Sequence, residues 1–238
     1  MNIALIGYGK MGKAIEEIAV QKGHSIVLKV NDQNLEDLTM DNLKKSDVAI
    51  EFTGPQSAVQ NILLCFEAHV PVVCGSTGWL EQMNLVQKTC TELEGTFVYA
   101  SNFSIGVNIF FELNRKLAAM MAKQPNYEVS IEETHHTEKK DAPSGTAITL
   151  AASILSVSPQ KNKWVNAPAA APGELSIISK RIDPAPGTHS VRYISDVDDI
   201  EIVHTAHNRK GFAAGALLAA EYTENKKGIF SMKDVLDL

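Results

Sequence analysis

Residues 1–12 read M-N-I-A-L-I-G-Y-G-K-M-G, and this stretch decides the fold that the sequence predicts. The apolar run 2–6 is typical of a buried strand. It leads directly into the pattern G-x-G-x-x-G, and an amphipathic helix is predicted from about 11 to 21, followed by a second strand over 25–30. Glycines at these places let the backbone turn tightly and approach a pyrophosphate bound at the helix N-terminus. The stretch therefore predicts a dinucleotide-binding unit, and a glycine turn with a purely structural role is the alternative.

An acidic residue follows the second strand. Asp32 lies 20 residues after Gly12, where a carboxylate can accept hydrogen bonds from the ribose hydroxyls of a dinucleotide. Such a carboxylate favours NADH and repels the 2′-phosphate of NADPH, although Lys10 and Lys29 could offset the repulsion and Asn31 could occupy the discriminating position instead. We therefore predict that both NADH and NADPH are used, with NADH not worse than NADPH.

Strands and helices continue to alternate up to about residue 107. Strands are predicted over 47–52, 71–74 and 96–99, with helices over 56–68 and 80–93. This alternation predicts a Rossmann-type parallel sheet. Small polar residues follow each strand, and they would either line a ligand cleft at the carboxyl ends of the strands or serve as ordinary turn residues.

The regular alternation of predicted strands and helices ends in the second half of the chain. A long helix is predicted over 108–123 and a half-buried strand over 127–133, with Val129 and Ile131 facing inward. A polar stretch over 158–172 precedes further strands over 175–182, 190–195 and 199–205. The sequence thus predicts a smaller α+β domain with a mixed or antiparallel sheet, open to solvent or a partner on one face. Helices over 212–222 and after Ser231 close the chain.

Residues 133–147 read E-T-H-H-T-E-K-K-D-A-P-S-G-T-A and carry the candidate chemistry of this second domain. His135, His136 and Lys139 can donate protons, and Ser144 is a good N-cap for the apolar helix that follows. A helix N-terminus binds anions. We expect the loop that carries His135 and Lys139 to face this terminus and bind a small carboxylate or phosphate substrate, although a structural histidine pair is the alternative.

The stretch 133–147 resembles the signature E-x-H-H-x-x-K-x-D-A-P-S-G-T-A of the dihydrodipicolinate reductases, also called 4-hydroxy-tetrahydrodipicolinate reductases, and every fixed position is matched. Nearly the whole chain shares this resemblance. Further matches to the family are F-T at 52–53, G-[ST]-T-G at 75–78, A-x-N-F-S-x-G-V-N at 100–108 and H-x-A-x-x-R-x-x-F-A-x-G-A at 204–216.

The resemblance implies a nicotinamide-dependent reductase of lysine and diaminopimelate biosynthesis. A hydride would pass to C4 of a cyclic dicarboxylate, with loss of its 4-hydroxyl, to give tetrahydrodipicolinate. It implies a dinucleotide-binding domain over 1–107 and 208–238, and a substrate-binding and oligomerisation domain over 108–207.

The resemblance also assigns the site residues. His135 and Lys139 would supply the proton. The substrate would be held by His136, Lys139, Ser144, Gly145 and Thr146. The cofactor would be bound by Gly7, Tyr8, Gly9, Lys10, Met11, Gly12, Asp32, Phe52, Thr53, Gly75, Ser76, Thr77, Ala100, Ser101, Asn102, Phe103 and Arg209.

The sequence departs from the family after Arg192. Family members carry a G-E-H turn before the next strand, and here that element is missing, so the hairpin is shorter. The family forms tetramers through this sheet, and an exposed apolar face and edge usually need cover. We therefore predict a homo-oligomer through the second domain, with dimer and tetramer both open.

Composition excludes several other classes of protein. The chain has 238 residues and a formal charge of −6, which argues against a nucleic-acid partner. No apolar run is long enough for a membrane span, and the N-terminus does not resemble a signal peptide. The three cysteines are an odd number and lie in apolar or helical settings, so we expect a reduced, cytoplasmic protein. The histidines lack metal-site spacing, so no metal is predicted.

Two other functions remain open: a different two-domain dehydrogenase, such as one acting on aspartate, and a nucleotide sensor without turnover.

Overall fold

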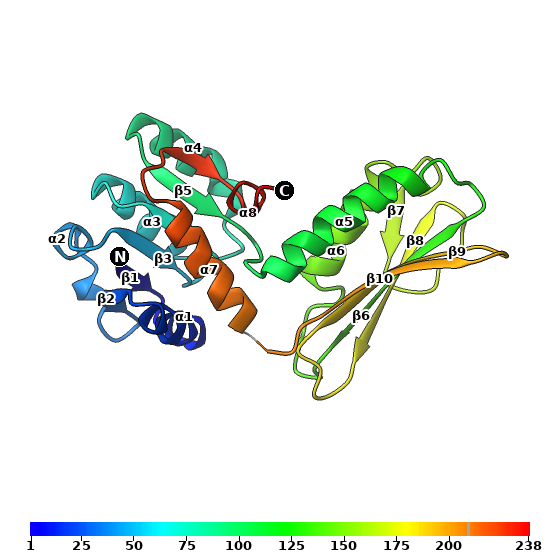
Figure 1. Cartoon of the computed structure of the whole chain (residues 1–238), viewed down its shortest axis with the longest axis horizontal. Coiled ribbons are helices and arrows are strands. Elements are labelled where there is room, and N and C mark those ends of the chain that lie inside the picture. The colour runs from blue at the N-terminus through cyan, green and yellow to red at the C-terminus, as the bar shows by residue number, and fades with distance from the viewer. Residues whose placement is uncertain (209) are drawn as a thin grey trace. The chain divides into compact units, whose positions relative to one another are not determined.

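The structure is a computed structural model that describes residues 1–208 and 210–238 (Figure 1). The chain divides into two units. One consists of Met1–Ile105 with Lys210–Leu238, and the other is Gly106–Arg209, of which Arg209 is not described. Each unit has a sheet and a hydrophobic core of its own.

The first unit contains a parallel sheet with the strand order β11-β5-β4-β3-β1-β2. Its strands are short and mostly apolar, as expected for strands that are covered on both faces. Their bounds are β1 (Asn2–Ile6), β2 (Ser25–Val30), β3 (Val48–Glu51), β4 (Val72–Cys74), β5 (Thr96–Tyr99) and β11 (Gly228–Phe230).

Helices cover both faces of this sheet. Ala4 and Ile6 of β1 belong to the core beneath α3 (Ala58–Glu67) and α4 (Met83–Glu92). Ile3 and Leu5 point the other way, into the core beneath α1 (Lys10–Gln21), α7 (Lys210–Tyr222) and α8 (Met232–Leu236). Figure 1 shows α7 lying across the sheet. Short helical turns complete the connections: Leu35–Asp37, α2 (Met40–Leu43) and Leu80–Gln82. The predicted Rossmann-type parallel sheet is confirmed.

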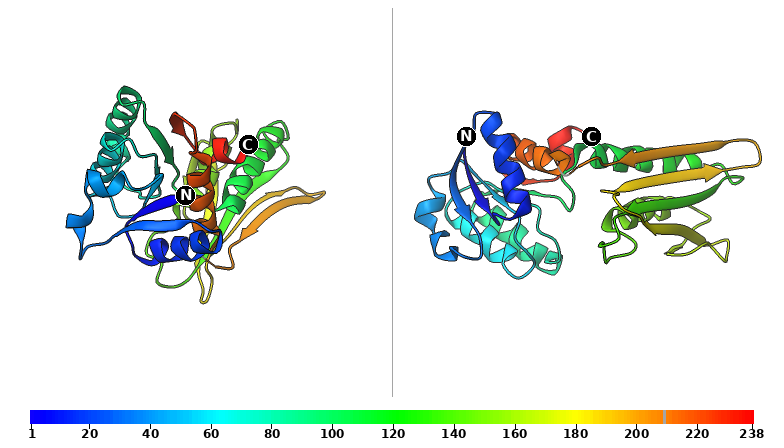
Figure 2. Two further views of the ribbon diagram at one scale, coloured as in Figure 1. Left: turned by 60° about the vertical axis from the view of Figure 1, so that its left-hand side comes forward. Right: turned by 90° about the horizontal axis from the view of Figure 1, so that it is seen from below.

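The second unit contains a mixed sheet with the strand order β10-β9-β6-β8-β7, which can be followed in the right-hand view of Figure 2. β8 is parallel to both β6 and β7, whereas β9 is antiparallel to β6 and β10. The strand bounds are β6 (Glu128–His135), β7 (Lys163–Val165), β8 (Glu174–Arg181), β9 (Thr188–Ile194) and β10 (Asp199–Thr205).

One face of the mixed sheet is covered by α5 (Ile105–Met121) and α6 (Gly145–Leu155). Val129 and Ile131 of β6 are buried against Leu150 and Ile154 of α6, as predicted for inward-facing residues. The predicted smaller α+β domain with a mixed sheet is therefore confirmed. None of the helices in the part of the chain that the structure describes is long and apolar enough to cross a membrane.

The opposite face of the mixed sheet is largely polar. Glu132 of β6 forms an ion pair with Lys180 of β8, and Arg192 of β9 binds Asp199 of β10. Val203 of the edge strand β10 and Ile194 of β9 are apolar exceptions, with exposed fractions of 56% and 39%. The face is therefore suited to contact with water as well as with a partner.

Two strands were not predicted from the sequence. β7 lies inside the polar stretch over 158–172, and β11 follows the helix α7. Each has three residues, which is too short for an apolar period to be visible. They form because a neighbouring strand offers an unpaired edge: β7 pairs with β8, and β11 pairs with β5.

Candidate active site

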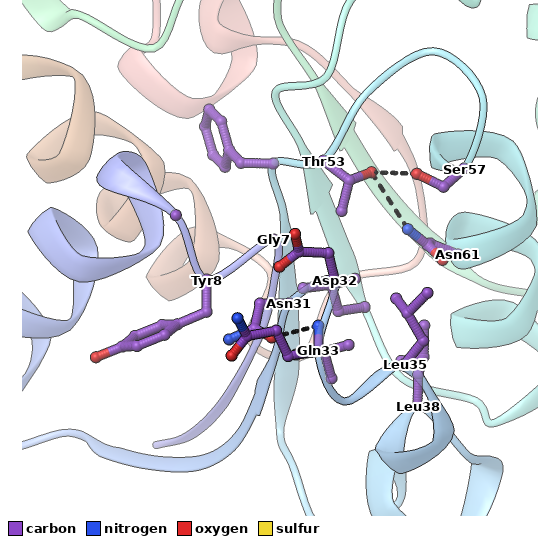
Figure 3. A pocket seen from close by; sticks show the side chains of 14 residues that line it. Gly7, Tyr8, Asn31, Asp32, Gln33, Leu35, Leu38, Thr53, Ser57 and Asn61 are labelled. Carbon is purple, nitrogen blue, oxygen red and sulfur yellow. Dashed lines mark hydrogen bonds between the residues drawn. The ribbon is translucent and has the colours of Figure 1, made fainter.

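A pocket of about 530 Å³ opens at the carboxyl ends of β1, β2 and β3 in the first unit (Figure 3). Ligands of doubly wound sheets bind at this place. Of the predicted cofactor residues, Gly7, Tyr8, Gly9, Asp32, Phe52 and Thr53 line the pocket. Its other lining residues are Ile6, Val30, Asn31, Gln33, Leu35, Leu38, Ser57 and Asn61.

The glycine turn is packed against the end of β3. Gly7 has a φ of +95°, and a Cβ atom there would lie 2.1 Å from the carbonyl oxygen of Phe52. A Cβ atom on Gly12 would lie 2.9 Å from the carbonyl oxygen of Gly7. Larger residues would push the turn away from the strand end, so these two glycines set the backbone that a pyrophosphate would approach.

Polar and apolar groups occupy different parts of the pocket. Figure 3 shows Asp32 between the turn at Gly7 and Thr53, whereas Leu35 and Leu38 lie together on another side. A carboxylate can accept hydrogen bonds from a ribose diol, and an apolar wall can contact a base. These groups fit the adenosine half of a dinucleotide. None of the described residues that line the pocket is basic.

The nearby Lys29 is engaged in a cluster of its own. Its ammonium forms an ion pair with Glu16 of α1 and lies 5.1 Å from the centroid of the Tyr8 ring. The Tyr8 hydroxyl donates a hydrogen bond to Glu16 as well. The hydrogen bond with Glu16 raises the pKa of Lys29, and the hydrogen bond from Lys29 lowers the pKa of Glu16. The charge of Lys29 is thus already balanced within the protein.

Thr53 is held by a fully buried carboxylate. Its backbone N–H donates to Glu51 Oε1 at 3.0 Å and to Ser76 Oγ at 2.8 Å, and its hydroxyl donates to Glu51 too. The Ser57 hydroxyl donates to Thr53 Oγ1 at 2.9 Å. The strand-end segments after β3 and β4 are therefore tied together at the pocket.

Other predicted cofactor residues lie beside this rim. A Cβ atom on Gly75 would lie 2.1 Å from the Phe52 ring, and the Phe103 ring centroid is 5.7 Å from that of Phe52. Arg209 lies outside the described residues. The predicted cofactor residues that do not line the pocket are Lys10, Met11, Gly12, Gly75, Ser76, Thr77, Ala100, Ser101, Asn102 and Phe103.

In the second unit, His135 is the last residue of β6 rather than part of a loop. The expectation of a loop histidine was wrong, because β6 keeps its pairing with β8 as far as His135. His135 pairs in register with Arg181, and its ring centroid is 5.0 Å from that of His189. The strand therefore fixes the direction of the His135 side chain, which is 8% exposed.

A fully buried carboxylate, Glu133, joins the groups around His135. Its Oε1 accepts hydrogen bonds from the Ser144 backbone N–H and from Arg181, both at 3.1 Å. Its Oε2 lies 3.1 Å from His135 Nδ1 and 3.7 Å from His189 Nε2. Burial opposes ionisation, yet the hydrogen bonds from His135, Ser144 and Arg181 hold the pKa of Glu133 well below its usual range. Glu133 is therefore anionic at neutral pH.

His189 is neutral at the same pH. Burial, followed by the charge of His135, lowers the pKa of His189 to about 4. Its Nε2 lies 3.0 Å from Ser144 Oγ, which itself accepts a hydrogen bond from the Ala147 N–H at 3.2 Å. The serine hydrogen can then be donated to His189.

The predicted helix start is confirmed. Ser144 caps α6, and Gly145 and Thr146 form its first turn. Gly145 is exposed, and apart from its chain neighbours and its own helix no atom lies within 4 Å of where its Cβ would stand, so the start of α6 is open at this residue. Because Glu133 binds the Ser144 N–H, this helix end lies beside His135.

Lys139 and His136 lie further along the chain. The Lys139 ammonium binds Asp141 at 2.7 Å, and its carbonyl oxygen accepts a hydrogen bond from Arg181. His136 lines a shallow hollow with Thr137, Glu138 and Asp183. Arg181 thus joins Lys139 to the Glu133 cluster, whereas His136 directly follows His135 in the chain and lines this hollow.

The Glu133, His135 and His189 ligand atoms all lie within 4.8 Å of one another, a spacing that could hold a metal ion. However, the second oxygen of Glu133 already binds the Arg181 guanidinium, and His189 Nε2 contacts Ser144. The positive charge of Arg181 disfavours a second cation there. The sequence did not reveal this arrangement, and the expectation of no metal stays a prediction.

The chain is similar to known protein families and proteins. Residues 1–103 match the family described as Dihydrodipicolinate reductase, N-terminus, and residues 106–236 match Dihydrodipicolinate reductase, C-terminus. A protein of Christiangramia forsetii named 4-hydroxy-tetrahydrodipicolinate reductase is 50% identical over 99% of this chain and 98% of its own length. A protein of the same name from Alkaliphilus oremlandii is 35% identical over 100% of this chain and 99% of its own length.

Solved structures share the fold. A dipicolinate-bound dihydrodipicolinate reductase from Paenisporosarcina sp. TG-14 has a TM-score of 0.77 at 24% identity, with 97% of each chain covered. An amine dehydrogenase from Mycobacterium smegmatis has a TM-score of 0.61 at 11% identity, covering 98% of this chain and 95% of that one.

Proposed function

The chain belongs to the dihydrodipicolinate reductase family, and we propose that it reduces 4-hydroxy-tetrahydrodipicolinate to tetrahydrodipicolinate with NADH or NADPH. It is an NAD(P)H-dependent oxidoreductase. The structural observation that carries the proposal is the placement of His135, fixed at the end of β6, beside the accessible N-terminus of α6.

The net reaction adds one hydride and one proton to the cyclic dicarboxylate and releases one water. When bound, the reduced nicotinamide supplies the hydride to C4 of the ring. Gly7 lets the pyrophosphate approach the turn, and Asp32 binds the ribose diol. Thr53, held by Glu51 and Ser76, bounds the pocket at the end of β3.

The second unit binds and protonates the substrate. The N–H groups of Gly145 and Thr146 bind a substrate carboxylate at the start of α6. In the free protein the Lys139 ammonium binds the Asp141 carboxylate. When the substrate is bound, Lys139 binds a substrate carboxylate instead, because that group is anionic as well. His135 and Lys139 supply the proton, and His136 and Ser144 complete the substrate-binding set. These roles are supported by the match to the family signature over 133–147.

The two units have different roles. We assign cofactor binding to residues 1–107 and 208–238, and substrate binding and assembly to residues 108–207. The pocket at the strand ends of the first unit and the Glu133 cluster of the second support this division. Lysine and diaminopimelate biosynthesis in the cytoplasm is the cellular setting that follows from the family.

A homo-oligomer is also part of the proposal, with the second unit as its interface. The edge strand β10 and the uncovered face of the mixed sheet support it, and Val203 is exposed there. Because most of that face is polar, the interface would be rich in hydrogen bonds. Light scattering at micromolar concentration should give a mass of two or four chains, and the mass of a single chain would refute the assembly.

A coupled assay tests the activity. Pyruvate, aspartate semialdehyde and the preceding synthase generate the substrate, and the loss of reduced nicotinamide absorbance measures turnover. Oxidation of NADH should depend on every component. No oxidation with either cofactor would refute the enzyme, and would favour a nucleotide sensor without turnover.

A further inference from the structure

Glu133 is fully buried beside His135, and neither the hydride nor the proton transfer described above assigns it a role. We propose that Glu133 is a positioning residue that holds the His135 ring with its Nδ1–H toward the carboxylate, so that Nε2 faces the substrate as the proton donor. This inference rests on the proposed function, because it specifies the state of the histidine on which that function depends.

The contacts of Glu133 leave one oxygen for His135. Oε1 accepts hydrogen bonds from the Ser144 N–H and from Arg181, each at 3.1 Å. Oε2 lies 3.1 Å from His135 Nδ1, and neither of these two buried atoms has another hydrogen-bond partner among the described residues. A buried carboxylate oxygen and a buried ring nitrogen at this distance are best satisfied by a proton between them.

His189 is the competing donor to the same oxygen. Its Nε2 lies 3.7 Å from Glu133 Oε2 but only 3.0 Å from Ser144 Oγ. Ser144 Oγ already accepts the Ala147 N–H, so its own hydrogen is available to His189 Nε2. A neutral His189 that accepts this hydrogen has no proton on Nε2 to give to Glu133. The Nδ1–H of His135 is left as the partner of Oε2.

The other ring nitrogen of His135, Nε2, lies beside Gly187, which has no side chain to fill the space next to it. A Cβ atom at residue 187 would lie 3.1 Å from His135 Nε2, and the residue there is Gly187. Glu133 therefore acts at two places through one carboxylate. It sets the direction and tautomer of His135, and it ties the N-cap residue Ser144 of the substrate helix to the same point.

The negative charge of Glu133 also favours this orientation of the His135 ring. The groups that face the cluster are Arg181 from β8, His189 from β9, Lys139 and Asp141 from the segment before α6, and His204 from β10, which acts on His189. Glu133 is the fully buried anion among them. Without its charge, a protonated His135 would face the Arg181 guanidinium with no anion between them.

Kinetics of Glu133→Gln test the proposal, with Glu132→Gln as the matched control. The control makes the same chemical change one residue away and breaks an exposed ion pair with Lys180. We expect Glu133→Gln to lower kcat by about 10²–10⁴-fold, as for loss of a correctly held general acid or base. Its NADH dissociation constant should stay unchanged, and the control should keep kcat within about twofold.

The split between kcat and KM separates this role from a purely structural one. The amide oxygen of a glutamine can still accept the Ser144 N–H, so the start of the substrate helix should keep its place and the substrate KM should change little. The kcat should fall, because the glutamine no longer offers His135 Nδ1 a carboxylate. Glu133→Gln with kcat within about twofold of wild type would overturn the proposal.

A spectroscopic measurement shows whether His135 Nδ1 carries a proton, and it does not depend on catalysis. Long-range ¹⁵N–¹H correlation spectra of wild-type protein report which histidine nitrogens carry protons, and loss of a signal in His135→Gln assigns the residue. We expect His135 Nδ1 to be protonated at neutral pH. An unprotonated Nδ1 would overturn the proposal even if Glu133→Gln failed to fold. A wild-type protein that shows the expected spectrum but no turnover would refute the proposed function alone.

Discussion

The cofactor pocket predicts a measurable preference for NADH. Asp32 projects a carboxylate into a pocket whose described lining residues include no base, and Lys29 is paired with Glu16. The 2′-phosphate of NADPH carries a charge of about −1.5 to −2 near neutral pH. Two unit charges about 4 Å apart interact by about 1 kcal/mol in water, so the repulsion in this open pocket is about 2 kcal/mol. That free energy corresponds to roughly a thirtyfold difference in affinity.

Steady-state kinetics with each cofactor measure this preference as a ratio of kcat/KM values. We expect wild type to favour NADH by about tenfold to thirtyfold at low salt, and less at high salt because ions screen the repulsion. Asp32→Ala should bring the two values close together, mainly by improving NADPH. Glu36→Ala is the control, since Glu36 is exposed on the same connection and does not line the pocket. A strong NADPH preference that survives Asp32→Ala would show that Asp32 does not meet the ribose.

Two further predictions concern the second unit. His189 has a pKa lowered from 6.5 to about 4 in the folded state, so the unfolded chain binds more protons between these values. Stability should therefore decrease as pH falls from about 6.5 to about 4, by up to about 3 kcal/mol, and urea denaturation of His189→Asn should show a correspondingly weaker pH dependence. Gly187 has a φ of +155°, which L side chains rarely adopt, and a Cβ atom there would lie 3.1 Å from His135 Nε2. Gly187→Ala should therefore lower the thermal unfolding midpoint and should also lower kcat by about tenfold or more. A normal kcat in Gly187→Ala would show that Nε2 does not face the substrate.

Local patterns were sufficient to predict most of the first unit. The glycine turn, the alternation of short apolar strands with helices and the acid after β2 each lie within a short stretch, and the structure brings Gly7, Asp32 and Thr53 to one pocket. The helix start at Ser144 was readable for the same reason, because a cap involves residues close in sequence. β7 and β11 were missed because each depends on the edge of another strand rather than on its own residues.

The Glu133 cluster could not be predicted in full. Its partners come from β6, β8, β9 and the start of α6, and their meeting depends on strand order and register. Arg181 is the clearest example: it reaches Glu133 because β8 runs parallel to β6 and pairs Arg181 with His135. No local sequence pattern encodes that register. The same pairing extends β6 to His135, where the sequence had favoured a loop.

The most direct test of the central claim is the kinetics of His135→Gln, with Lys139→Ala measured beside it. Loss of a general acid should lower kcat by about 10²–10⁴-fold in His135→Gln with a modest change in the substrate KM. Lys139→Ala should lower kcat and also raise the KM, because it removes a charge that binds the substrate. Fluorescence titration should show nearly unchanged NADH binding in both variants, since the cofactor pocket lies in the other unit. If both variants keep more than about half of the wild-type rate, far above what loss of a general acid leaves, the stretch from Glu133 to Ala147 is not the catalytic centre.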